Sequence, residues 1–439
     1  MTPDHTQAQL TRGITRPHLV GILINTIVGA GILGLPSKAF ALVGAWSLVT
    51  WLLCAVVVLG IALCLAEVST RFRDSGGPYL YALTAFGPTV AFATGWLRLL
   101  TSVLAYATVC NLLIGYLSLV APVVAGGTAR IATITLLSAA LTFVLVRGLK
   151  GTVWTSTMIS AGKILLLTVF VAVAAFHFEP SRVHWTPIPR PTEFAAASLL
   201  SIFAFFGFEL GSITSGEVAD PERDHPFAII ASIGITTLLY LLVQLACIGT
   251  LDSLALSSRP VADAASAMVG AIGGIAVTSS AVVLLLGVLL GLLVGASRTL
   301  FAMGERGQMP GTVASVHPRW RTPLVAIVVV ATASWLSTIA SSFTTAITIA
   351  VGTRVLTYIV VCAALPALRR RQDVPAARFK LPAGELIAGA SIIACTALLA
   401  TAKSTDLLAL AVLVAVGLAL RGVLGVSAQA ADGADSSRG

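Results

Sequence analysis

The feature that most constrains this chain is a series of long apolar runs that follow one another from residue 18 to residue 424. About 20 consecutive apolar residues cross the hydrocarbon core of a bilayer as a helix. Only 10% of the residues are charged and 57% are hydrophobic, whereas soluble domains carry about 25% charged residues. No soluble core could bury so much apolar surface, so the sequence predicts an all-α polytopic membrane protein.

The apolar runs divide into about 12 candidate membrane spans. The narrowest division lies between the ninth and the tenth, where only Ser341 and Ser342 separate two runs. The expected spans are residues 18–42, 45–70, 86–120, 130–146, 153–177, 193–216, 226–250, 268–303, 323–341, 343–367, 385–402 and 405–424. Residues 1–17 are polar, unlike a signal peptide, and we expect them to form a cytoplasmic N-terminal segment.

The basic residues between the spans set the expected orientation, because cytoplasmic loops carry an excess of Lys and Arg. With a cytoplasmic N-terminus, the inner segments hold 17 of the 27 basic residues and the outer segments hold five. We therefore expect a multi-pass protein of the cell inner (plasma) membrane with both termini in the cytoplasm. The net charge of +9 is spread over short loops, so it indicates this topology and no nucleic-acid partner.

Two of the expected spans contain clustered glycines. The first includes Gly29 and Gly31, and the sixth includes Gly207 beside Glu209. Glycine lets the backbone leave helical geometry, and in lipid an unwound backbone is tolerated only where it lines a cavity. Such breaks at the starts of two five-span halves are typical of transporters with inverted repeats. The alternative is that the small residues only allow close helix packing.

Four stretches of the sequence resemble the amino acid–polyamine–organocation (APC) family of transporters, which has the leucine-transporter fold. They are residues 28–32, 66–81, 206–223 and 297–310. One departure is Arg73, where the family usually has proline. The resemblance implies a five-plus-five inverted repeat, residues 18–180 and 190–370, followed by two C-terminal helices within 384–424. Residues 425–439 are small and polar, and we expect them to form a disordered cytoplasmic tail.

The resemblance also implies a central substrate site between spans one, three, six, eight and ten. The substrate carboxylate would bind backbone N–H groups after the first break, and its ammonium would bind carbonyl groups at both breaks. Phe203 would be the aromatic gate over the substrate. The residues expected to bind the substrate are Ile27, Gly29, Ala30, Gly31, Ile32, Thr101, Ser102, Tyr106, Phe203, Phe206 and Gly207.

Lys163 is a charged residue in the middle of the fifth span. Burial disfavours the charged form of a lysine, so a buried lysine can exchange a proton near neutral pH. The resemblance implies proton coupling, since proton-coupled relatives have a lysine here, and its ammonium would bridge carbonyls near Val28 and polar groups of span eight. The alternative is a fixed structural cation that does not titrate.

Three further charged residues lie inside spans, where they are costly without partners. The resemblance implies that Glu209 is a cytoplasmic-side gate or a proton site, and that Arg98 of span three pairs with it. The alternative is that Arg98 points to interfacial water. Arg354 of span ten pairs with Glu209 in place of Arg98, or it binds a substrate carboxylate bidentately. Glu67, near the end of span two, is expected to be a structural anchor at the inner face.

These features favour a secondary active transporter of amino acids, with proton-coupled uptake of a neutral amino acid by alternating access. The alternative is an amino-acid or amine exchanger or exporter on the same scaffold, with an acidic substrate if Arg354 binds it. The chain has no P-loop, nucleophile elbow or repeated filter motif, which argues against an enzyme or a channel. We expect no cofactor and no metal, because no two histidines share a helical face at ligand spacing. The expected partners are protons, the lipid bilayer and a small-molecule substrate, with the protein a monomer or a homodimer.

Overall fold

The computed structural model describes residues 16–72, 77–147, 153–209 and 221–423. Within these ranges most residues lie in helices joined by short connections, and none of them lies in a β-strand. Arg73 and the part of the expected sixth span after Glu209 lie outside the described residues. The helices are α1 Arg16–Ile27, α2 Ala30–Val43, α3 Ser47–Ser69, α4 Gly77–Phe86, α5 Pro88–Leu117, α6 Gly127–Arg147, α7 Val153–Phe176, α8 Pro191–Ser201, α10 Pro221–Thr250, α11 Pro260–Glu305, α12 Leu324–Ala340, α13 Phe343–Arg369, α14 Gly384–Ala400 and α15 Ser404–Val423.

The described helices are long and apolar enough for a membrane protein. Seven helical stretches in this part of the chain could each cross a membrane, and four shorter apolar helices accompany them. The first of these stretches, Ala30–Ser69, contains both α2 and α3. They meet at Gly44, whose φ of 58° allows the chain to turn. The class of an all-helical membrane protein is confirmed, while the number of 12 spans and the inverted repeat stay predictions.

Two helix boundaries test the spans expected from the sequence. The division at Ser341 and Ser342 is confirmed, because α12 ends at Ala340 and α13 begins at Phe343. The Ser342 hydroxyl caps α13 by accepting a hydrogen bond from the Thr345 N–H at 3.2 Å. The expected eighth span at 268–303 lies within a longer helix, α11, because a helical segment from residue 260 precedes a kink at residues 269–270.

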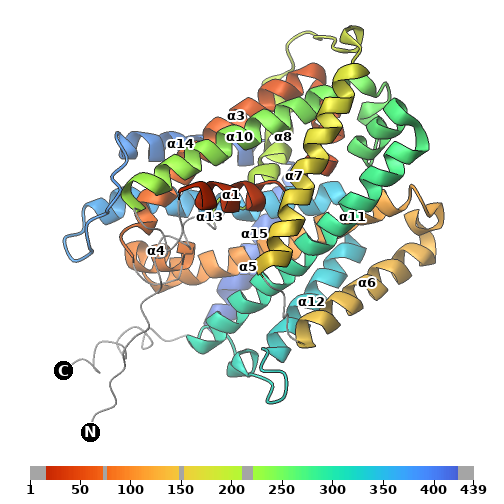
Figure 1. Cartoon of the computed structure of the whole chain (residues 1–439). Helices are drawn as coiled ribbons and strands as arrows, with labels where there is room; N and C mark the ends of the chain where they lie inside the picture. Colours follow the sequence, from red (N-terminus) through yellow and green to blue (C-terminus); the bar gives the residue numbers. More distant parts are fainter. Residues whose placement is uncertain (1–15, 73–76, 148–152, 210–220, 424–439) are drawn as a thin grey trace.

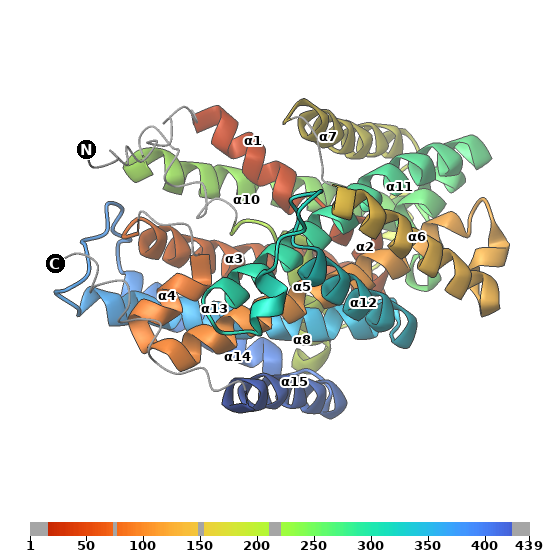
Figure 2. The same ribbon diagram turned by 90° about the horizontal axis from the view of Figure 1, so that it is seen from below.

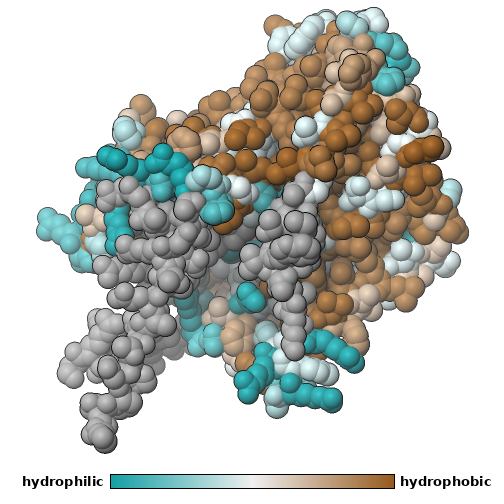
Figure 3. Space-filling view, viewed as in Figure 1, coloured by the Kyte–Doolittle hydropathy of each residue, from teal (hydrophilic) through white to brown (hydrophobic). Residues whose placement is uncertain are grey.

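Helix α5 runs through the middle of the bundle, with α11, α12 and α13 packed along it. Helix α1 lies along α10, and α6, α7 and α15 lie at the periphery (Figures 1 and 2). Large apolar side chains on the outer helices are exposed, such as Leu136 of α6 at 72% and Ile272 of α11 at 82%. Apolar side chains predominate over the upper and right parts of the face in Figure 3, which suits a surface in contact with lipid.

Candidate functional site

Both predicted helix breaks are present. Between α1 and α2 the chain leaves helical geometry at residues 28 and 29, and Gly29 is the N-cap of α2. After α8 the chain passes through a 3-10 turn, Ile202–Phe205, into a further turn over residues 206–209. Gly207 has a φ of 118°, which L side chains rarely adopt. The clustered glycines therefore mark interruptions, and the alternative of close packing alone does not account for them.

The two breaks lie directly against each other. A Cβ atom added to Gly31 would lie 2.5 Å from the Cα of Ala204, and one added to Gly207 would lie 2.3 Å from the carbonyl oxygen of Thr26. Real Cβ atoms essentially never approach backbone so closely. Glycine is thus needed at both positions for the backbone of the first break to pass the backbone of the second.

One side chain that the sequence analysis missed holds the two breaks together. The hydroxyl of Tyr240, on α10, lies 3.0 Å from the carbonyl oxygen of Ile27 and 2.8 Å from that of Ala204. Its single proton is shared between two carbonyl groups that the breaks leave without helical partners. Tyr240 is fully buried. The sequence feature that could have indicated this role is a polar side chain in the middle of an otherwise apolar span.

Gln244, one helical turn after Tyr240, makes a second polar bridge that was not predicted. Its amide nitrogen donates to the carbonyl oxygen of Pro36 in α2 at 3.2 Å. Its amide oxygen accepts a hydrogen bond from the Trp51 indole of α3 at 3.1 Å. Helix α10 thereby fixes the unwound segments and the helices on both sides of the first break.

The start of α2 is suited to bind an anion. The first N–H groups of a helix have no intrahelical partner and carry partial positive charge. Among the described residues no side chain caps the N-cap Gly29. Ala30, Gly31 and Ile32 are all buried at this end, so an anion bound by their backbone N–H groups would be shielded from solvent.

Lys163 of α7 is buried, and its ammonium group donates to the carbonyl oxygen of Asn25 in α1. Contact with the backbone of span one was predicted, and the carbonyl found lies nearly one turn before the expected Val28. The contact joins α7 to the part of α1 that leads into the break. Whether this lysine exchanges a proton stays a prediction.

Glu209 lies in a buried polar cluster between the second break and α13. Its carboxylate forms an ion pair with Arg354 at 3.0 Å and accepts a hydrogen bond from the hydroxyl of Tyr358. It also accepts the Gly207 N–H at 2.9 Å. The Arg354 guanidinium lies 4.9 Å from the ring centroid of Phe206, within the range of a cation–π contact. The Arg354–Glu209 pair, one of the two alternatives for Arg354, is thus present.

Arg98 lies in α5, is partly buried, and has a guanidinium nitrogen 3.4 Å from the Cβ position of Gly77, where α4 begins. The structure favours Arg354 as the ion-pair partner of Glu209, and the role of Arg98 in a gate stays a prediction.

The aromatic residues of the second break form one cluster. The Phe203 and Phe206 ring centroids are 5.2 Å apart, and Phe208 lies 5.4 Å from the Tyr358 ring. Phe203 is 8% exposed, so little of its ring is open to solvent. This geometry places the expected gate beside the Arg354–Glu209 pair.

The three predicted residues of span three do not converge on one point. The Thr101 hydroxyl lies 2.8 Å from that of Thr353 in α13. The Tyr106 hydroxyl lies 3.1 Å from Ser138 in α6. Ser102 is partly buried and donates to the carbonyl oxygen of Arg98 at 3.2 Å. Because Thr101 and Tyr106 contact different helices, they occupy different faces of α5, and substrate contact by all three stays a prediction.

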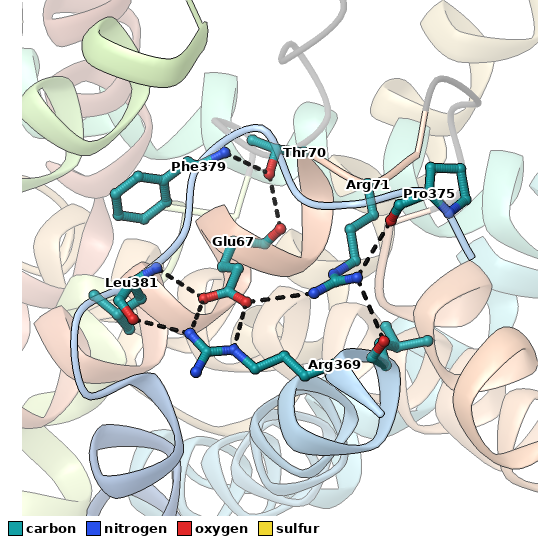
Figure 4. A network of polar contacts seen from close by, with 8 residues as sticks. Glu67, Thr70, Arg71, Arg369, Pro375, Phe379 and Leu381 are labelled. Carbon is teal, nitrogen blue, oxygen red and sulfur yellow. Dashed lines mark hydrogen bonds and ion pairs between the residues drawn. The ribbon is translucent and has the colours of Figure 1, made fainter. Parts of the chain in front are cut away.

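Glu67 is a buried anchor at the end of α3, as Figure 4 shows. Arg369, the last residue of α13, donates to both carboxylate oxygens at 2.8 and 2.6 Å. The Leu381 N–H donates to the same carboxylate at 2.8 Å, and Arg71 lies 3.6 Å away. The network ties α3 to the end of α13 and to the connection that leads into α14.

The comparisons with known proteins agree with this geometry. A family model described as amino acid permease matches residues 14–420. The branched-chain amino acid permease BcaP of Bacillus subtilis (strain 168) is 30% identical over 397 residues, which is 85% of this chain and 84% of that protein. The serine/threonine exchanger SteT of the same strain is 28% identical over 70% of this chain and 72% of its own length. The human cystine/glutamate transporter is 27% identical over 74% of this chain and 68% of its own length. With its helix breaks at two glycine clusters and a family match over nearly its whole length, this chain belongs to the amino acid permease family, within the APC transporters, and is a membrane transporter and not an enzyme.

Proposed function

We propose that this protein takes up a neutral amino acid together with a proton by alternating access. The observation that carries the proposal is the contact between the buried Lys163 ammonium and the Asn25 carbonyl oxygen. Among the described residues no carboxylate forms an ion pair with this ammonium group. Its charge is therefore costly in a membrane interior, and losing its proton removes that cost. Protonation of Lys163 would then decide how firmly α7 holds the end of α1, and through it the first break.

The surroundings of the breaks support an amino acid as the cargo. Buried N–H groups at the start of α2 suit the substrate carboxylate, and the carbonyl oxygen of Ile27 suits the ammonium. A carbonyl oxygen has two lone pairs, so the contact with Tyr240 leaves one for a substrate. The rings of Phe203 and Phe206 favour an apolar side chain, and Glu209 neutralises Arg354.

A second candidate is an exchanger with an acidic substrate. The observation in its favour is the position of Arg354 at the second break, where its guanidinium lies 4.9 Å from the ring centroid of Phe206 and pairs with one carboxylate, that of Glu209. A substrate carboxylate could displace Glu209 from Arg354, since a guanidinium binds carboxylates in a bidentate manner. Two of the relatives are described as an exchanger and as a cystine/glutamate transporter.

The basic residues near the helix ends support the proposed orientation of the bundle in the membrane. Helix α4 contacts both basic connections, through Tyr79 with Gln308 and through the Thr84 carbonyl with Arg371. The connection from α11 to α12 and the one from α13 to α14 therefore both lie near α4, at the same end of the bundle. An excess of Arg at this end supports a cytoplasmic location.

The test is uptake of a radiolabelled amino-acid panel into proteoliposomes, with and without an inward proton gradient. We expect gradient-driven accumulation of a neutral amino acid that Lys163→Ala abolishes, while substrate exchange in the mutant persists. Accumulation that ignores the gradient, together with exchange of internal for external substrate, would replace the uptake proposal by the exchanger. Strong exchange of an acidic amino acid that is abolished by Arg354→Gln and not by Lys163→Ala would support the exchanger with an acidic substrate.

A further inference from the structure

A cavity of about 460 Å³ lies away from the helix breaks, between the ends of α6, α11 and α12. Part of its wall is apolar, with Leu145 from α6, Phe301 from α11 and Ile327 from α12. The other part carries two arginines, Arg298 of α11 and Arg321 in the connection to α12. The proposed transport cycle uses none of these residues.

The two guanidinium groups carry uncompensated charge. Both arginines are exposed, and among the described residues neither forms an ion pair with a carboxylate. Arg147, at the end of α6, also has no such pair in this part of the chain, and it lies over the ring of the exposed Phe143 at 4.5 Å. An anion in the cavity would supply the missing counter-charge, and Arg binds phosphate oxygens in a bidentate manner.

The connection that forms one side of the cavity is held in a defined shape. The Thr322 hydroxyl donates to the carbonyl oxygen of Val146, near the end of α6, at 3.0 Å. The Arg321 N–H donates to the His317 carbonyl oxygen at 2.9 Å, and the His317 N–H donates to that of Thr322 at 2.9 Å. Arg321 has a φ of 51°, which is uncommon for a residue other than glycine. These hydrogen bonds fix the conformation of the connection that lines the cavity.

The surroundings of the cavity indicate which kind of anion it would bind. Exposed apolar side chains of α6 and α12, such as Phe143 and Leu336, continue from the helix ends toward the membrane interior. Hydrophilic side chains gather at the lower edge of Figure 3, where the connection between α11 and α12 lies. A ligand here meets positive charge at one end and apolar surface at the other. Basic pockets between transmembrane helices on the cytoplasmic side suit anionic lipid head groups.

We propose that this cavity binds an anionic phospholipid of the inner leaflet, with its phosphate between Arg298 and Arg321 and its acyl chains along α6 and α12. A lipid held there would join the end of α11 to α6 and α12, so the anionic lipid content of the membrane would affect how these helices move. The binding itself does not depend on which amino acid the protein carries.

The experiment measures binding of phosphatidylglycerol and phosphatidylcholine to the purified full-length protein by native mass spectrometry. We expect one site that prefers phosphatidylglycerol. Each arginine near an anionic lipid surface contributes about fivefold in affinity, so Arg298→Gln/Arg321→Gln should weaken binding about 25-fold. The matched control is Arg319→Gln/Arg378→Gln, which removes the same charge from two exposed arginines at the same end of the bundle that do not line the cavity. The control should stay within about twofold of wild type.

A second variant distinguishes a specific loss of lipid binding from a folding defect. Val316 lines the cavity and is 52% exposed, so Val316→Glu places a carboxylate at the site without disturbing buried packing, and it should also weaken phosphatidylglycerol binding. Equal losses in the test and control pairs would show a general effect of surface charge and overturn the proposal. Unchanged binding in Val316→Glu, or complete displacement of the lipid by millimolar inorganic phosphate, would overturn it as well.

Discussion

The hydroxyl of Tyr240 lies 3.0 Å from the carbonyl oxygen of Ile27, the last helical residue before the first break. The same hydroxyl lies 2.8 Å from the carbonyl oxygen of Ala204 in the second break. One side chain of α10 therefore sets the distance between two backbone segments that lie far apart in the sequence. Any substrate site made of both segments depends on that distance.

Tyr240→Phe is expected to lower both stability and substrate affinity. The mutation leaves two buried carbonyl groups without a donor, and an unsatisfied buried group costs about 1–3 kcal/mol. The matched control is Tyr116→Phe, since the Tyr116 hydroxyl donates to the Leu33 carbonyl oxygen at 2.8 Å within the intact part of α2. Thermal unfolding should show similar losses for both mutants. Uptake should show a raised KM for Tyr240→Phe alone, and an unchanged KM would contradict the role of the bridge.

Gly31→Ala and Gly207→Ala are each expected to abolish most of the transport. The new Cβ atoms would lie 2.5 Å from Ala204 and 2.3 Å from Thr26, on backbone atoms that cannot move aside without separating the two breaks. At Gly207 the φ of 118° adds strain of about 1–3 kcal/mol. The control is Gly21→Ala in α1, where no atom lies within 4 Å of the new Cβ. Uptake by Gly21→Ala should match wild type, and normal uptake by either of the other two mutants would refute the close approach.

The positions of the breaks were predictable from the sequence, because glycine clusters have few explanations inside an apolar span. The class of the fold was predictable for the same reason, since apolar length and charge scarcity depend on local composition. The split at Ser341 and Ser342 followed from a two-residue polar signal and is confirmed. These features are all encoded within short segments.

The partners across the bundle were less predictable, because they depend on how distant helices pack. Tyr240 and Gln244 look like ordinary polar residues in a span until the carbonyl groups of α1, α2 and the second break come into contact with them. The choice of Arg354 over Arg98 as the pair of Glu209 is of the same kind. From the sequence alone, either arginine could pair with Glu209. The choice depends on how α5 and α13 pack against the second break, which the sequence does not show.

Glu209→Gln and Arg354→Gln are each expected to impair the protein more than the double mutant does. Removing one partner leaves a buried charge without compensation, which costs about 3–5 kcal/mol, whereas removing both avoids that penalty. Thermal unfolding of the two single mutants and the double mutant gives the coupling energy. The comparison cycle uses Glu209→Gln with Arg98→Gln. A larger coupling of Glu209 with Arg98 than with Arg354 would contradict the ion pair in the structure.

Glu67→Gln is expected to loosen the connection between α13 and α14. The Glu67 carboxylate accepts hydrogen bonds from the Arg369 side chain and from the Leu381 N–H, as Figure 4 shows. A neutral amide cannot satisfy this arginine in the same bidentate manner, and breaking a buried pair costs about 3–5 kcal/mol. Hydrogen exchange of the segment 376–383 should therefore become faster in the mutant.

The control for this clamp is Asp373→Asn, which breaks the ion pair with Arg371 in the same connection. Both side chains of that pair are largely exposed, at 43% and 63%, and exposed pairs contribute about 0–1 kcal/mol. Exchange in 376–383 should stay near the wild-type rate in Asp373→Asn. If both mutants accelerate exchange equally, the connection is held by its own local charges, and Glu67 does not anchor it to α3. If only Glu67→Gln does so, the end of α13 moves with α3 because one buried carboxylate holds both.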